Sequence, residues 1–207
     1  MVGPRSPTRK RVPRIWSHPT GLVQSRQLRY YMQAIDLTQA TTMPEPVLQI
    51  VLYQPEIPFN AGNVGRTCVA IGAKLWLVRP LGFLVDDRHV RRAGLDYWEH
   101  LDWEVVDDWS SLLARLPGRT YWFLTKTARR HYTEAQIRPG DVLVFGSESK
   151  GLPAAMRQEH PEQCLRIPMH AKVRSLNLSV AAALVAYEAI RQWRLAGQMP
   201  EGLQGVF

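Results

Sequence analysis

The polar residues of segment 55–67 (PEIPFNAGNVGRT) have the composition of a ligand-binding loop. The segment follows an apolar run, and loops at the carboxyl ends of parallel strands are where such sheets bind ligands. Arg66 is predicted to lie in the first turn of a helix, where its charge opposes the helix macrodipole unless an anion sits nearby. Asn63 belongs to the same segment. The pattern therefore indicates either an anion-binding loop or a surface arginine on a well-formed strand–helix connection.

A second segment, 145–153 (FGSESKGLP), is a glycine-lined turn with one carboxylate, Glu148. Its glycines have the separation of a phosphate-binding loop, but Leu152 and Pro153 stand where that motif needs Lys and Ser or Thr. Ser149 lacks the preceding glycine of a nucleophile elbow. These absences argue against an NTPase and a serine hydrolase. What remains is a turn that a flat ligand could approach closely, or a tight strand-to-helix turn with no ligand.

A third segment, 167–179 (IPMHAKVRSLNLS), places Ser175, Asn177 and Ser179 at alternate positions before an apolar helix. Residues 180–187 are apolar on every side, which predicts a buried helix. The three polar side chains would then lie near the core, where buried polar groups need partners. Helix caps can satisfy one or two of them, and a bound ligand could satisfy the rest.

The charge of the chain favours a polyanionic partner. It has 207 residues, a net charge of +8, and no apolar run near the ~18 residues that span a bilayer. Residues 1–46 carry seven basic and two acidic residues, or +5, which leaves +3 for residues 47–207. Nucleic acid is the partner expected first. Because residues 47–207 are only mildly basic, local basic patches would have to bind it. Two such patches are Arg88, Arg91 and Arg92 at helical spacing, and Arg129, Arg130 and His131; a solvated charged face is the alternative for each.

Cysteine and histidine usage argues against a disulfide framework and a metal centre. The two cysteines form no CxxC pair, and the six histidines show no metal-ligand spacing. A reducing, cytoplasmic setting without a metal is the expectation.

Short apolar runs alternate with helical patterns from residue 47 onward, which predicts a parallel sheet covered on both faces. Strands are expected at 47–53, 74–78, 103–106, 121–125, 142–146 and 164–167, and helices at 63–73, 86–94, 110–116, 153–160 and 178–195. The domain is expected to span 47–196, with a C-terminal tail at 197–207. Residues 1–46 are predicted to be an extension: a disordered arm, a transit peptide, or the product of a start codon assigned upstream of Met43.

Taken together and in order, NAGNVGRT, FGSESKGLP and IPMHAKVRSLNLSVAAALVAYEA resemble the three motifs of the SPOUT superfamily of RNA methyltransferases, and within it the TrmH-like 2′-O-ribose methyltransferases. The likeness spans about residues 47–195. LYQPEIPFNAGNVGRTC, PLGF and DDRHVRRAGLDYW are most similar to members that methylate the wobble nucleotide of tRNA. Each motif is weak evidence alone, but the three at family spacing are specific.

The resemblance implies a Rossmann-like α/β fold whose C-terminal segment forms a deep trefoil knot, a homodimer, and S-adenosylmethionine as methyl donor without a metal. It implies methylation of the ribose 2′-hydroxyl of nucleotide 34, C or U, in the anticodon stem-loop of tRNA. The alternatives are another tRNA or rRNA position, or a non-catalytic RNA-binding protein on the same fold. The implied cofactor contacts are Leu124, Gly146, Ile167 and Ser175; the implied catalytic residues are Asn63, Arg66, Glu148, Ser175 and Asn177; the implied RNA contacts are Arg66, Arg88, Arg91, Arg92 and Arg174.

Overall fold

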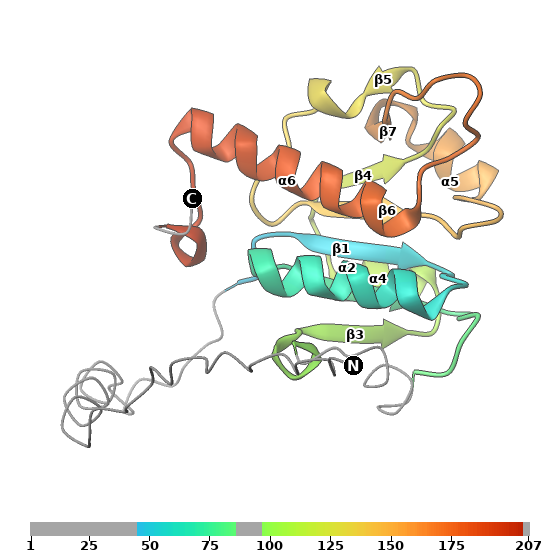
Figure 1. The fold of residues 1–207 in the computed structure, drawn as a ribbon, viewed down its shortest axis with the longest axis horizontal. Coiled ribbons are helices and arrows are strands. Elements are labelled where there is room, and N and C mark those ends of the chain that lie inside the picture. The colour runs from blue at the N-terminus through green and yellow to red at the C-terminus, as the bar shows by residue number, and fades with distance from the viewer. Residues whose placement is uncertain (1–44, 86–96, 205–207) are drawn as a thin grey trace, which may run out of the picture. The chain divides into compact units, whose positions relative to one another are not determined.

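The computed structural model describes residues 45–85 and 97–204. These ranges contain one sheet of seven parallel strands in the order β3-β2-β1-β6-β4-β7-β5. The arrowheads of β1, β3 and β4 point to the same edge (Figure 1). The strands are β1 (Gln49–Tyr53), β2 (Lys74–Val78), β3 (Trp103–Val106), β4 (Tyr121–Leu124), β5 (Arg130–His131), β6 (Val142–Phe145) and β7 (Cys164–Arg166). The parallel sheet is therefore confirmed.

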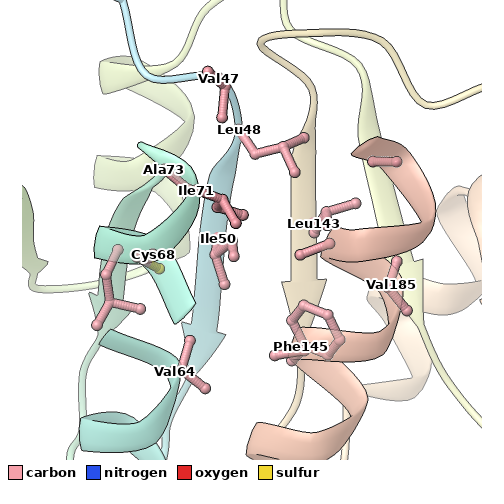
Figure 2. Packing of buried hydrophobic residues seen from close by; sticks show 14 of the residues in the cluster. Val47, Leu48, Ile50, Val64, Cys68, Ile71, Ala73, Leu143, Phe145 and Val185 are labelled. Carbon is pink, nitrogen blue, oxygen red and sulfur yellow. The ribbon is translucent and has the colours of Figure 1, made fainter. Parts of the chain in front are cut away.

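Helices cover both faces of this sheet because alternate residues of its strands point to opposite sides. Ile50 and Leu52 of β1 join a buried cluster under α2 (Pro58–Ile71) and α6 (Leu178–Ala196), as Figure 2 shows for Ile50. Val51 points the other way, into a cluster under α4 (Trp109–Arg115) and α5 (Ala154–Glu159). In the central strand β6 both faces are buried, so its four residues are apolar without alternation.

Helix α2 begins at Pro58, five residues before the predicted start at 63. Proline is favoured in the first turn of a helix, since its missing N–H would have no partner there, and its fixed φ suits the helix. The glycines and asparagines of this segment, which predict a loop, lie within the helix. Arg66 consequently lies in the middle of α2, and the prediction that it occupies the first turn is wrong.

The other predicted elements match closely. Helix α4 is capped by Asp108, whose side chain accepts a hydrogen bond of 2.7 Å from the Ser111 N–H. Strand β5 is absent from the prediction because two residues are too short to show a pattern. Four short 3₁₀ helices also lack a sequence signal, and the predicted helix at 86–94 lies outside the described residues. The 3₁₀ helices are η1 (Trp98–His100), η2 (Tyr132–Glu134), η3 (Pro161–Gln163) and η4 (Glu201–Leu203).

Helix α6 is buried on one face only. Ala182, Val185 and Ala189 are fully buried, whereas Val180 and Leu184 are 52% and 38% exposed. Tyr187 extends the exposed row by one turn and is 44% exposed. We call Val180 and Leu184 the α6 stripe. The prediction of a helix buried all round is wrong in this single chain, because nothing in the described ranges covers the stripe.

The residues after α6 return to the core. Gly197 ends the helix with φ +66°, a conformation that glycine adopts without strain. Leu203 is then 3% exposed within the same cluster as α2 and α6, and Met199 packs against it. The segment expected to be a tail therefore includes a buried residue, Leu203.

Candidate active site

Three residues expected to contact the cofactor lie side by side at the carboxyl edge of the sheet. Strand β4 lies between β6 and β7, and Leu124 at its end is opposite both Phe145 and Leu165. Gly146 directly follows β6, and Ile167 follows β7. Leu124, Gly146 and Ile167 are all partly exposed. The structure thus brings together residues that are far apart in the sequence.

Glu148 joins the second predicted segment to the first. Its Oε2 accepts a 2.8 Å hydrogen bond from the Glu56 N–H, and its Oε1 accepts from the Ile57 N–H at 3.2 Å and from Asn60 Nδ2 at 2.8 Å. In return, the Glu56 carboxylate accepts bonds from the N–H and hydroxyl of Ser149. Ile57 gives α2 no side-chain cap of its own, so Glu148 supplies the negative charge that a helix N-terminus favours.

Asn60 connects the third segment to this junction. Its side chain is buried, its Nδ2 donates to Glu148, and its Oδ1 accepts a 2.9 Å hydrogen bond from Asn177 Nδ2. Asn177 caps α6 by accepting from the N–H groups of Ser179 at 2.9 Å and Val180 at 3.3 Å. We call Glu148, Asn60 and Asn177 the polar junction. It links the loops after β1, β6 and β7 at one point.

Asn60 is absent from the predicted site residues. The signal that could have found it is Pro58, which marks the start of α2 and so puts Asn60 in the first turn, beside the donors that need an acceptor. Glu148, in contrast, was predicted beside the reaction centre. Both of its oxygens accept hydrogen bonds from the segment entering α2, so in this geometry it positions that segment.

Arg66 and Asn63 are exposed on one face of α2, one turn apart. The Arg66 guanidinium lies over the Tyr97 ring, 4.7 Å from its centroid. The Tyr97 hydroxyl donates a 2.9 Å hydrogen bond to the Gly62 carbonyl on the same helix. Tyr97 is itself buried, so a fixed aromatic ring holds the guanidinium while leaving its edge open to solvent.

The predicted buried ladder of Ser175, Asn177 and Ser179 is wrong. Residues 167–177 form no strand, and Ser175 and Asn177 are exposed in this chain. Asn177 finds its partners in the helix cap and Asn60, and the Ser179 hydroxyl donates to Asn177 Oδ1 at 2.7 Å. Arg174 is exposed as well.

Two glycines allow backbone segments to approach closely at this edge. A side chain at Gly146 would overlap the backbone of Gly151 and Leu152, because the turn folds back on itself there. A side chain at Gly82 would lie 2.7 Å from the Glu56 Cα, where the PLGF segment packs on the loop before α2. Gly146 is therefore required by the protein's own turn.

The predicted basic patches have different outcomes. Arg88, Arg91 and Arg92 lie outside the described residues. Arg130 donates to the Glu134 carbonyl at 2.6 Å, and His131 Nε2 lies 2.9 Å from the Arg166 guanidinium. These are contacts within the protein. In that patch only Arg129 is exposed.

Other kinds of chemistry find no support in the described ranges. They contain no group of three or more His, Cys, Asp or Glu residues that could hold a metal ion. Burial raises the pKa of both thiols, Cys68 and Cys164, which keeps them protonated and poorly nucleophilic near neutral pH. A search of the same ranges for a helix able to cross a membrane finds none.

Known proteins share both the sequence and the fold. The SpoU rRNA Methylase family matches residues 47–187. A tRNA (cytidine(34)-2′-O)-methyltransferase of Methylovorus glucosotrophus is 48% identical over 73% of this chain and 99% of its own length. The enzyme of the same name from Burkholderia ambifaria is 46% identical over 73% of this chain and 97% of its own. The family match covers the whole sheet and all three predicted segments.

Solved structures agree. One, from work on the 2-OH methylation of C/U34 on tRNA, is 49% identical with a TM-score of 0.67, covering 72% of this chain and 97% of that chain. A structure from Bacillus anthracis is 44% identical with a TM-score of 0.69, covering 74% of this chain and 99% of that chain. With its fold, its three segments and these relatives in agreement, the chain belongs to the SpoU rRNA methylase family.

Proposed function

We propose that this protein methylates the ribose 2′-hydroxyl of nucleotide 34, C or U, in tRNA, with S-adenosylmethionine as methyl donor. The observation that carries the proposal is the polar junction, which joins all three segments at the carboxyl edge beside the exposed Arg66. Relatives more than 40% identical over nearly their whole length are named for this reaction. The target in the anticodon stem-loop follows from those relatives.

The residues at the carboxyl edge fit the cofactor. Leu124, Gly146 and Ile167 offer uncharged, partly exposed surface on three adjacent loops, which suits the flat, apolar face of an adenine ring. Ser175, on the loop that leads to α6, is exposed and free to add a hydroxyl contact. When bound, the cofactor supplies a methyl group on a positively charged sulfur.

The chain's own residues hold the ribose in line with that methyl group and remove the hydroxyl proton. Correct placement of two reactants supplies much of the rate of such a transfer. Arg66 and Asn63 face the RNA, and the planar guanidinium suits a phosphate oxygen pair. Arg66 either positions the phosphate or takes the proton, and the high pKa of an ordinary arginine favours positioning. Glu148 and Asn177 hold the loops through the polar junction.

The test is to map ribose methylation in tRNA from a strain that lacks this protein. We expect 2′-O-methylation at position 34 to disappear, to return with the wild-type gene, and to stay absent with the Arg66→Ala gene. Loss of a methyl group at another tRNA or rRNA position would establish the runner-up. Unchanged methylation throughout would favour a non-catalytic RNA-binding protein, a reading that the exposed Arg66 and the polar junction argue against.

We also propose that the C-terminal segment forms the trefoil knot expected of the family. The strand order supports this, because β7 lies between β4 and β5, so the connection from Leu124 to Arg130 must pass the end of β7.

The two free, buried cysteines support a reducing cytoplasmic setting.

We propose that the protein is a homodimer through the α6 stripe, whose exposed apolar side chains need a cover. Leu184→Glu is expected to shift the protein from dimer to monomer at micromolar concentration, because a carboxylate cannot be buried in an apolar interface without a partner. Light scattering measures the mass. The matched control is Leu113→Glu, on an exposed leucine of α4 across the sheet, and should leave a dimer. A wild-type mass of one chain at this concentration would rule out the dimer.

Residues 1–46 are proposed to be an extension of a methyltransferase domain at 47–196, since the family match also begins at residue 47. A chain starting at Met43 is expected to fold and to methylate tRNA at a rate within about twofold of the full chain. Circular dichroism and a methyl-transfer assay check this. If the shortened chain folds but binds tRNA much more weakly, the arginine-rich extension is an RNA-binding arm and the prediction fails.

A further inference from the structure

The positive charges of the domain are segregated by position. Three connections follow the adjacent strands β4, β6 and β7: residues 125–129, 146–153 and 167–177. They hold five cations and one acid, Glu148, a net charge of +4. Residues 47–207 carry +3 in all, so the rest of residues 47–207 carries −1. The positive excess of the domain therefore resides in three connections at one edge.

These five cations are also free of internal partners. All are exposed, and none makes an ion pair or a side-chain hydrogen bond with another residue of 45–85 or 97–204. We call them the basic rim: Lys126, Arg129, Lys150, Lys172 and Arg174.

Several cations elsewhere are held by carboxylates of the domain. Lys74 lies 3.3 Å from Asp102, Arg119 is 3.0 Å from Glu45, and Arg191 is 2.7 Å from Glu188. Glu148, the single acid among the rim connections, is occupied by the segment entering α2. The rim thus presents uncompensated charge, which attracts a polyanion.

We infer that the basic rim is the surface that binds the RNA phosphate backbone and orients the substrate over the active site. This rests on the proposed function and adds Lys126, Lys150 and Lys172 to it, since Arg129 and Arg174 were already expected to contact nucleic acid. Two of the rim connections begin with Gly146 and Ile167, and the third follows Leu124 directly, so phosphates bound there lie beside the methyl donor. Contacts to phosphates fix the position of a nucleic acid without reading its sequence.

The double variant Lys150→Gln/Lys172→Gln tests this. Each lost phosphate contact lowers the slope of log K against log salt by about 0.7–0.9. Binding of unmodified tRNA, measured by fluorescence anisotropy over a salt series, should therefore show a slope about 1.5 smaller and an affinity at least tenfold lower at low salt. S-adenosylmethionine affinity and the melting temperature should not change, because both side chains are exposed and neither makes an ion pair or a side-chain hydrogen bond within 45–85 and 97–204.

The matched control is Arg138→Gln/Arg194→Gln. Both arginines are exposed and without an ion pair in the described ranges, and they lie at the opposite end of the sheet, before β6 and in the last turn of α6. The control removes the same charge, so it should leave the salt slope within about 0.3 of the wild type. Equal slope changes in the two doubles, or none in the rim double, would overturn the inference.

Binding is measured without methyl donor, so the result is readable even if the methylated position proves different. If tRNA from the deletion strain keeps its methyl group at position 34 while the rim double still lowers the slope, the proposed function fails and the rim stands. If the methyl group is lost but the rim double binds normally, the rim fails and the function stands. Rim-dependent binding to anionic lipid vesicles without rim-dependent tRNA binding would also overturn the inference.

Discussion

Arg66→Ala is expected to lower methyl transfer to tRNA by about 10²-fold or more, or about 2.7 kcal/mol of transition-state stabilisation. The guanidinium is held over Tyr97 with its edge open to solvent, where it can bind a phosphate or take a proton. The affinity for S-adenosylmethionine should not change, because Arg66 lies on α2, which follows β1, and not on the connections after β4, β6 and β7 that are proposed to hold the cofactor. Single-turnover kinetics and calorimetry measure the two quantities separately.

The control is Arg66→Lys, which keeps the charge but not the planar pair of donors. If Arg66 positions a phosphate, this variant should recover only part of the rate and keep the wild-type pH profile. If Arg66 takes the proton, the lysine variant should show an apparent pKa moved toward that of lysine. The site assignment is wrong if Arg66→Ala retains near-normal turnover on tRNA that lacks the wobble modification. Loss of the contact with Tyr97 should cost only about 0.5–1 kcal/mol of stability.

Gly146→Ala is expected to abolish measurable S-adenosylmethionine binding and to lower the melting temperature by several degrees. The added carbon would overlap the backbone of Gly151 and Leu152, and no side-chain rotation can relieve a clash with backbone. Overpacking of this kind costs about 1–3 kcal/mol, and about 2–4 °C follows per kcal/mol in a chain of this size. The turn must open, which displaces the loop that carries Glu148.

Gly202→Ala is the matched control, because an added carbon at Gly202 meets nothing within 4 Å. It should bind S-adenosylmethionine and melt like the wild type. Titration calorimetry and thermal melts of both variants decide the outcome. Normal cofactor binding by a folded Gly146→Ala protein would show that the turn after β6 does not shape the cofactor site.

The helices and strands could largely be predicted from the sequence. The apolar run at 142–146 contains β6, whose four residues are all buried, because a strand covered on both faces must be apolar throughout. The helix predicted at 110–116 differs from α4 by one residue at each end, since a helix start depends on capping residues within one turn. The family, too, was readable from three short segments in order. These signals are local: each depends on residues close together in the sequence, and not on the rest of the chain.

Which side chains form hydrogen bonds at the polar junction is apparent only in the folded chain. Glu148 accepts hydrogen bonds from residues about 90 positions away, and Asn177 reaches Asn60 across 117 positions. No periodicity encodes such a pair, because it depends on the order of strands in the sheet. For the same reason the sequence could not show that Gly146 must lack a side chain, because its neighbours Gly151 and Leu152 are brought there by the folded turn.

Burial was likewise decided by the assembled fold. An apolar helix such as 180–187 predicts burial on every side, yet the sheet can cover only one face of α6 and leaves Val180 and Leu184 exposed. The net charge predicted a polyanionic partner, but its location could not be predicted. Lys126, Lys150 and Lys172 are scattered over 47 positions in the sequence, and they gather at one edge because parallel strands end on the same side of the sheet.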